Sequence, residues 1–180
     1  RERADPGMGS NFTLDDVEAF SGRVLDYKWT LLGERAVLSV SNSEHVTPTT
    51  FGPYSRVPKD RWQLRDCYVL ELESILSDHP YKKRFLLIDQ ETYTVVAVLV
   101  INRENKFWKV LYNVYKWEGM SNAAGAAPEN SMLKPQYAGS IDLLAKTASL
   151  VHTYSKLKFP KMSPKKIKRA YSVSTLSEGR

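Results

Sequence analysis

The strongest hydrophobic pattern in the chain lies between residues 81 and 118. Three segments, YKKRFLLI, YTVVAVLVI and FWKVLYNVYKWE, are separated by the turn sequences DQET and NRENK, which predicts three consecutive antiparallel strands. The middle segment, residues 93–101, is apolar at both odd and even positions. A strand with one solvated face alternates apolar with polar residues, so we expect this strand to be covered on both faces. One cover is a helix or a second sheet; the other is of the same kind or a bound apolar ligand.

Weaker β patterns extend this meander toward both ends of the chain. The residue at the break between the first two of them, Gly33, predicts a bulge or a turn. Together, these segments predict a mainly β fold of seven or eight antiparallel strands in sequential hairpins, arranged as an open, curved half-barrel. The additional strands are predicted at residues 24–32, 35–40, 61–74, 137–144 and 147–154.

Short helices are predicted near both ends, packed at the concave side or the ends of the half-barrel. Thr13 is a suitable N-cap for a helix over residues 14–20. Ser163 followed by proline predicts a second helix that ends near residue 170. Residues 41–59 and 119–135 lack strand patterns and are predicted as loops that gate the interior. The expected division is a lead-in segment (1–10), the antiparallel half-barrel (11–160), and a basic helix and tail (161–180).

Four blocks in this order resemble one known family. They are FTLDDVEAFSGRVLDYKWTLLGER, PYSRVPKDRWQLRDCYVLE, HPYKKRFLLIDQETYTVVAVLV and NKFWKVLYNVYKW, within a resemblance that covers residues 5–170. The family is the uncharacterised, outer-membrane-lipoprotein-sorting-like family of Gram-negative periplasmic proteins, and the chain matches its C-terminal half. The resemblance implies a LolA/LolB-like curved sheet with an apolar interior, a periplasmic location, and an N-terminal half that supplies the rest of the barrel. A glycine usual in the turn before Trp108 is absent, and Asn105 stands there instead.

The formal net charge of +6 belongs to the end of the chain. Residues 154–180 sum to +7, so the remainder is nearly neutral. A basic tail suits anionic lipid head groups or an acidic partner, and a merely solvated tail is the alternative. The strand aromatics lie in the near-neutral part, which argues against nucleic acid as a partner. The candidate contact residues are Lys156, Lys158, Lys161, Lys165, Lys166, Lys168 and Arg169.

Catalytic and metal-binding patterns are missing from the sequence. Cys67 is the only cysteine, and the three histidines, His45, His79 and His152, have no metal-ligand spacing. No nucleophile motif is present either. We therefore expect a protein without a cofactor or metal, which is not an enzyme.

Three carboxylates need a separate interpretation. Asp66 falls among aromatic residues on an apolar strand face, where pairing with Arg61, Arg65 or Lys83 is more plausible than acid–base chemistry. Asp89 and Glu91 lie at a predicted hairpin turn, where local hydrogen bonds to the backbone explain them.

An apolar ligand is the functional class that the strands favour. Two short helices offer too little surface to cover a sheet of this length, and leftover apolar surface marks a binding site. With the resemblance, this predicts a periplasmic carrier that hands a lipid or lipidated molecule between membranes or to an export assembly. The alternative is a non-catalytic scaffold subunit of an outer-membrane or exporter complex. The residues expected to share the inward face are Tyr27, Trp29, Leu31, Trp62, Tyr68, Leu70, Phe85, Leu87, Tyr93, Val95, Leu99, Trp108 and Tyr112.

Overall fold

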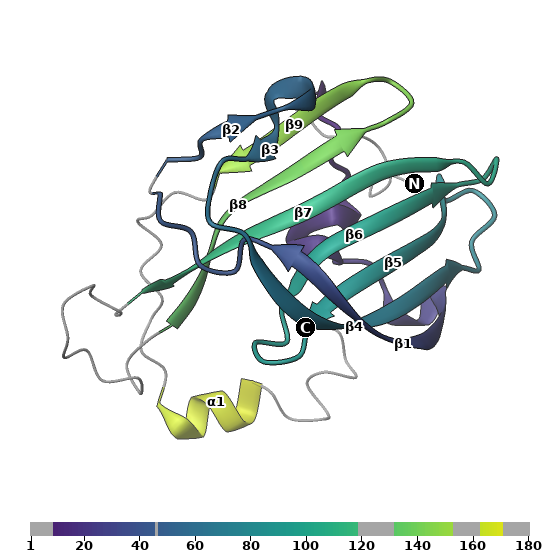
Figure 1. Cartoon of the computed structure of the whole chain (residues 1–180). Helices are drawn as coiled ribbons and strands as arrows, with labels where there is room; N and C mark the ends of the chain where they lie inside the picture. The colour runs from purple at the N-terminus through teal and green to yellow at the C-terminus, as the bar shows by residue number, and fades with distance from the viewer. Residues whose placement is uncertain (1–8, 46, 119–131, 153–162, 171–180) are drawn as a thin grey trace.

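Seven antiparallel strands form one open sheet, which confirms the predicted fold class (Figure 1). The computed structural model describes residues 9–45, 47–118, 132–152 and 163–170. Neighbours in the sheet follow chain order apart from the first pair, and β1 and β9 are its two edges. The strands are β1 (Tyr27–Ser39), β4 (Gln63–Ser74), β5 (Tyr81–Asp89), β6 (Val95–Asn102), β7 (Phe107–Glu118), β8 (Met132–Asp142) and β9 (Thr147–His152).

The remaining elements are short. The 3-10 helix η3 lies against one face of the sheet, behind β6 and β7 in Figure 1. None of the helices in the described ranges is long and apolar enough to span a bilayer. The elements are η3 (Leu14–Ala19), η4 (Val24–Asp26), β2 (Thr50–Phe51), η5 (Pro53–Ser55), β3 (Val57–Pro58) and α1 (Pro164–Ala170).

Two predicted boundaries were wrong, and one was confirmed. A single strand, β1, replaces the two strands expected around Gly33, because a bulge between Leu31 and Gly33 absorbs the irregularity. Strand β8 begins at Met132, within the segment expected to be a loop; residues 119–131 lie outside the described part. Helix α1 begins after Ser163, whose Oγ accepts a hydrogen bond from the Lys166 amide at 3.4 Å.

The face that carries η3, called here the inner face, contains the main hydrophobic core. Leu86, Val98 and Leu111 are cross-strand neighbours on this face, and all three are buried together with Ala19 of η3. Each fully buried aliphatic side chain of this size contributes roughly 1.5–3 kcal/mol. The inner face is therefore covered, as the sequence predicted.

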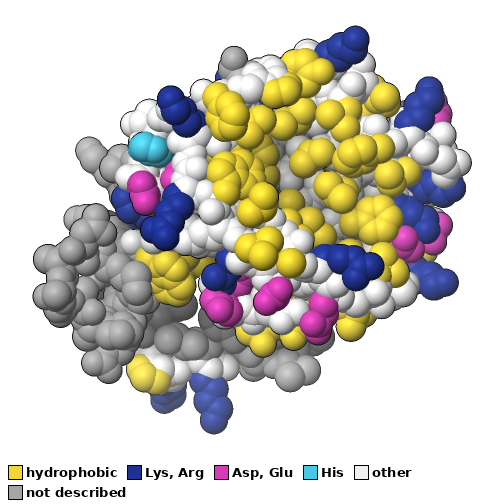
Figure 2. Space-filling view, in the orientation of Figure 1, with side chains coloured by type: hydrophobic (Ala, Val, Ile, Leu, Met, Phe, Trp, Pro, Cys, Tyr) yellow, Lys and Arg dark blue, Asp and Glu magenta, His cyan; other side chains and the backbone are white. Residues whose placement is uncertain are grey.

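The opposite face, called here the outer face, is covered over one part only. After β1 the chain crosses to β7, where the Ser43 amide donates to the Tyr115 carbonyl at 2.8 Å, and Val40 packs with Val114 and Tyr137. Over β5–β7, apolar side chains remain partly exposed, and Figure 2 shows hydrophobic side chains gathered on this face. Of the two covers expected for this part of the outer face, a second protein layer is not seen among the described residues, and a bound apolar ligand stays a prediction.

Candidate ligand-binding site

Helix η3 is fixed to the inner face through the side chains of its first turn. The Oδ2 atom of Asp16 accepts hydrogen bonds from the Thr13 amide at 2.8 Å and from the Tyr81 hydroxyl at 2.8 Å. The Nδ1 atom of His79 accepts the Tyr81 amide at 3.0 Å, so Nε2 carries the hydrogen and faces Asp15 Oδ2 at 3.0 Å. Both aspartates are buried. The Oδ2 atom of each accepts these hydrogen bonds, while the Oδ1 atom of each lacks a hydrogen-bond partner among the described residues.

Two buried cations complete this anchor. Arg84 donates to the Asp15 carbonyl at 3.0 Å, and its guanidinium lies 3.6 Å from Asp16 Oδ1. Lys109 Nζ donates to the Asn11 carbonyl at 2.8 Å and to the Tyr81 hydroxyl at 3.2 Å. Arg84 is 0 % exposed and Lys109 only 2 %. A buried cation is tolerated where its charge is compensated and it is hydrogen-bonded. Arg84 pairs with the aspartates, whereas Lys109 relies on its hydrogen bonds and on the Trp108 ring, 4.2 Å from Nζ.

Burial changes the acid–base behaviour of this cluster. It lowers the pKa of Lys109, although the carboxylates of Asp16 and Asp142 partly oppose that effect. It raises the pKa of Tyr81, and the charge of Asp16 raises it further. The Tyr81 hydroxyl therefore stays protonated. It accepts a hydrogen bond from Lys109 Nζ and donates one to Asp16 Oδ2. Because these groups are buried between helix and sheet, they fix the helix in place, and of them only Asp16 also lines the pocket beside the cluster.

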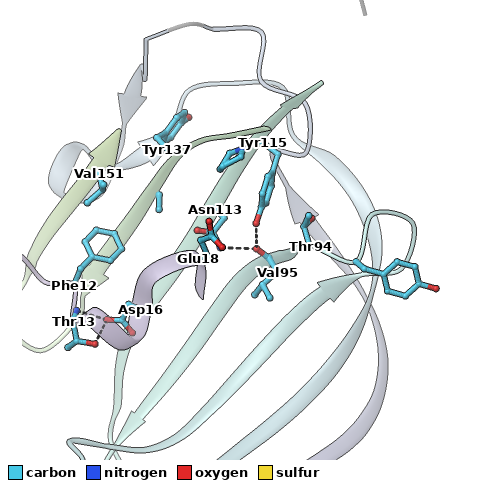
Figure 3. A pocket seen from close by; sticks show the side chains of 13 residues that line it. Phe12, Thr13, Asp16, Glu18, Thr94, Val95, Asn113, Tyr115, Tyr137 and Val151 are labelled. Carbon is cyan, nitrogen blue, oxygen red and sulfur yellow. Dashed lines mark hydrogen bonds between the residues drawn. The ribbon is translucent and has the colours of Figure 1, made fainter. Parts of the chain in front are cut away.

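Beside the anchor, a pocket opens between η3 and strands β6–β9 (Figure 3). Its volume is about 490 Å³, within the range of small-molecule sites. Apolar side chains of the sheet and Phe12 make up most of its walls. The lining residues are Phe12, Thr13, Asp16, Glu18, Tyr93, Thr94, Val95, Asn113, Tyr115, Pro135, Tyr137, Ala138 and Val151.

Most polar groups of the pocket wall are bonded to one another. The Val95 carbonyl accepts hydrogen bonds from Asn113 Nδ2 at 2.9 Å and from the Tyr115 hydroxyl at 3.2 Å, as Figure 3 shows. The hydroxyl groups of Thr92 and Thr94 are 2.8 Å apart. Burial, with the Glu18 charge as a smaller cause, raises the pKa of Tyr115 to about 12, so its hydroxyl remains a donor. Since these groups satisfy each other, the wall that they form behaves as an apolar surface.

The structure does not bring the predicted ligand-binding residues together on one face. Tyr93 and Val95 line the pocket. Strand register places one group in or against the inner core and a second group on the outer face. The first group is Tyr27, Trp29, Leu70 and Trp108; the second is Phe85, Leu87, Leu99 and Tyr112.

The other members of that prediction also differ from the expectation. Leu31 is 61 % exposed and Trp62 is 41 % exposed, while Tyr68 is half-buried opposite Ile88 in β5. Tyr112 has a structural role, because its ring lies so close to Gly139 that a Cβ there would be 2.0 Å from the ring. The prediction of one shared face was wrong because side chains alternate along each strand, and the sequence does not give the register between strands.

The carboxylates singled out in the sequence lie outside the pocket. Asp66 is exposed and forms no ion pair within the described ranges, because Arg65 pairs with Asp89 and Glu91 instead. The turn interpretation of Asp89 is confirmed: its Oδ1 accepts the amides of Glu91 and Thr92 at 2.9 Å. Burial alone would raise the pKa of Asp89, but the hydrogen bonds from Arg65 and the two amides outweigh it and lower the pKa to about 2.

The remaining predictions concern Cys67, the histidines and the basic tail. Cys67 is buried, and burial raises the pKa of its thiol to about 11, as suits a structural cysteine. No cluster of metal-ligating side chains occurs in the described part. Of the tail, Lys165, Lys166 and Lys168 are exposed on α1, the Arg169 side chain is not described, and Lys156, Lys158 and Lys161 lie outside the described residues.

Sequence reasoning missed most of the pocket and the whole anchor. A usable signal existed in two strands, where a charged residue shares the face of apolar neighbours. Arg84 has the same parity as Leu86, and Lys109 has the same parity as Leu111. A cation on an apolar face requires a buried partner, and the acidic pair at the start of the predicted helix supplies it.

Solved structures of other proteins share this fold. A domain from Vibrio parahaemolyticus described as an outer membrane lipoprotein-sorting protein domain has 16 % identity and a TM-score of 0.57, over 93 % of this chain and 56 % of the other. A DUF1329 family protein from Desulfovibrio piger ATCC 29098 has 12 % identity and a TM-score of 0.54, over 97 % and 57 %. A LolA superfamily protein from Nitrosomonas europaea has 18 % identity and a TM-score of 0.52, over 92 % and 58 %.

The chain spans a little over half of the length of each of these three proteins. At such identities the likeness concerns the fold alone. No curated protein matches the chain closely enough in sequence to count as a relative. The family described as "protein of unknown function (DUF1329)" matches residues 2–175, and the chain therefore belongs to the DUF1329 family.

Proposed function

We propose that this protein is a non-catalytic carrier that binds a lipid or a lipidated molecule in the pocket between η3 and β6–β9. The observation that supports this best is the state of the pocket wall. The polar groups of Val95, Asn113 and Tyr115 are bonded to one another, while Phe12, Ala138 and Val151 present apolar surface. Such a wall gains by contact with hydrocarbon and gives little hold on a polar substrate.

The size of the pocket agrees with this proposal. Transfer of hydrocarbon from water is worth about 0.8 kcal/mol per buried CH₂. A short stretch of an acyl chain therefore provides useful affinity without any specific hydrogen bond. The fold shared with a lipoprotein-sorting domain and a LolA superfamily protein is compatible with this kind of ligand.

The proposal extends to the setting in which the carrier works. We place it in the periplasm, where it hands its ligand between membranes or to an export assembly. The exposed lysines of α1 (Lys165, Lys166 and Lys168) suit contact with anionic lipid head groups, at about 1 kcal/mol for each residue near the surface.

A second candidate function rests on the outer face. Its partly exposed apolar side chains over β5–β7 (Figure 2) suit a scaffold that contacts another protein of an outer-membrane or exporter complex. In that case the pocket would be empty in the purified protein, and lipids would not compete with the protein partner.

Native mass spectrometry of the gently purified protein, followed by lipid extraction, separates the two functions. A carrier retains a stoichiometric apolar molecule, and Val151→Trp, which narrows the pocket, reduces its occupancy. Ala148→Trp is the matched control, since register places Ala148 on the outer face of the same strand. If the protein is empty and ignores added phospholipids, the carrier function is wrong and the scaffold remains.

A further inference from the structure

The described lining of the pocket is negatively charged, whereas the whole chain has a positive net charge. Two carboxylates, Asp16 and Glu18, line it, and no Lys, Arg or His is among the described residues of its lining. The whole chain has a formal net charge of +6. A ligand that enters the pocket therefore meets negative charge, despite the basic character of the protein.

Glu18 lies where a ligand would meet it. Glu18 and Ala19 both have left-handed backbone, with φ of 52° and 76°, a conformation that is costly for residues other than glycine. Glu18 lines the pocket together with Asn113 and Val95, and Figure 3 draws all three side chains. No hydrogen bond or ion pair joins the Glu18 side chain to another described residue. Its charge nevertheless acts on the pocket interior, since it contributes to the raised pKa of Tyr115 after the larger effect of burial.

A second lining group is buried and incompletely satisfied. Asp16 is 4 % exposed, and its Oδ1 atom has no hydrogen-bond partner. The nearest cation, Arg84, is 3.6 Å from this oxygen, too far for a good hydrogen bond. This carboxylate lines the same pocket as Glu18. The described lining also includes the Tyr137 hydroxyl, which lacks a hydrogen-bond partner, but its charged groups are both carboxylates.

The nearby cations cannot reverse this character. Arg84 and Lys109 do not line the pocket, and both already donate to backbone carbonyls, of Asp15 and Asn11 respectively. An anionic head group at this site would lie against the Glu18 carboxylate, and no cation is among the described lining residues to bind it. A head group with an ammonium or another N–H donor would find an unpartnered carboxylate.

We propose that the ligand of this pocket combines an apolar chain with a cationic or N–H-donating head group, which Glu18 binds, and that the pocket discriminates against fatty-acid anions. This inference rests on the proposed function, because it names the head group of the ligand whose chain the pocket holds. The choice of head group would then depend on Glu18, which is not part of the apolar wall of the pocket.

Three probes with twelve-carbon chains test the inference: dodecylamine, 1-dodecanoylglycerol and dodecanoate. Each displaces a neutral fluorescent probe, N-phenyl-1-naphthylamine, from the protein at low ionic strength and below its micelle concentration. Dodecylamine should bind about tenfold tighter than dodecanoate, equivalent to about 1.4 kcal/mol. Glu18→Gln should remove most of that preference, while 1-dodecanoylglycerol binds the variant unchanged.

Two controls make the result specific. Glu104→Gln removes an exposed carboxylate that pairs with Lys106 in the β6–β7 turn and should leave the preference intact. Val151→Trp should weaken all three amphiphiles, because it narrows the shared pocket. Equal binding of amine and carboxylate, unchanged by Glu18→Gln, would overturn the head-group inference and leave the carrier function standing. If none of the amphiphiles displaces the probe, the carrier function itself fails.

Discussion

The two ends of η3 differ in how their polar groups are used. At the first turn, Asp15 and Asp16 are buried. Their carboxylates are hydrogen-bonded to His79 and Tyr81 and form ion pairs with Arg84. At the last turn, Glu18 is exposed, its backbone is left-handed, and it lines the pocket. The helix is thus anchored at one end and offers a ligand an unpartnered carboxylate at the other.

Within the six residues of η3, the first turn therefore stabilises the fold and the last turn carries the residue proposed to bind the ligand. The buried cluster is large and charged, and by composition alone it resembles an active site. Its members, however, are buried and bonded mostly to one another, and only Asp16 among them also lines the pocket, whose wall is largely apolar. The proposed ligand site is therefore the pocket, because its side chains are accessible and Glu18 has no partner among the described residues. The larger number of charged groups in the buried cluster does not mark a binding site.

Removal of the anchor should give the largest effect. Arg84→Met leaves two buried aspartates without their cation, and the loss of one partner of a buried ionic group costs about 3–5 kcal/mol. Urea unfolding measures this as a fall in the free energy of unfolding. Lys83→Met is the matched control, since the neighbouring Lys83 pairs with Glu71 and Glu73 in a partly exposed setting, where such pairs contribute about 0–1 kcal/mol. Equal losses for the two variants would mean that the cluster does not anchor η3.

The ion pair of Asp89 with Arg65, which lies outside η3, gives a pH-dependent test of how much a buried carboxylate stabilises the fold. The pKa of Asp89 is lowered from 3.8 to about 2, so this carboxylate stabilises the fold above its unfolded pKa and loses that contribution as pH falls from about 4 to 2. At about 1.4 kcal/mol per pKa unit, the contribution at neutral pH is about 2 kcal/mol. The difference in unfolding free energy between the wild type and Asp89→Asn should therefore shrink over this range. A difference that is constant from pH 7 to pH 2 would contradict the assigned pKa.

The smallest effect on stability is expected at the other end of η3. Glu18→Gln removes an exposed charge with no partner among the described side chains, so the free energy of unfolding should stay within about 0.5 kcal/mol of the wild type. Urea unfolding in parallel with Arg84→Met checks this. A loss of several kcal/mol would show that Glu18 also holds the helix, and the contrast between the two ends would disappear.

Much of the fold could be predicted from the sequence, because strands and turns are local patterns. The meander of β5, β6 and β7, the short helix after Thr13 and the start of α1 follow from alternation and capping residues. The face of the sheet on which each apolar side chain lies could not be predicted in the same way. Phe85 and Leu86 are adjacent and both apolar, yet register places Phe85 outside and Leu86 in the core.

The pocket was beyond sequence reasoning for a related reason. Phe12 and Val151 line the same cavity from opposite ends of the chain, and no local pattern relates positions so far apart. Bulges add to the difficulty, since each one shifts the following side chains to the other face, as in β8, where Pro135 and Tyr137 pair with the adjacent Tyr115 and Val114 of β7. An apolar surplus on a long sheet does not depend on register, so the expectation of an apolar ligand could be stated from the sequence, and it stays a prediction.

The account depends most on the claim that the ligand lies in the inner pocket and not on the apolar outer face. Photo-crosslinking with a neutral monoacylglycerol that carries a diazirine in its acyl chain, followed by peptide mass spectrometry, tests this directly. The account predicts labels on pocket residues such as Phe12, Tyr115 and Val151, and a loss of labelling in Val151→Trp. Labels concentrated on Phe85 and Leu99 of the outer face, unaffected by that substitution, would contradict it.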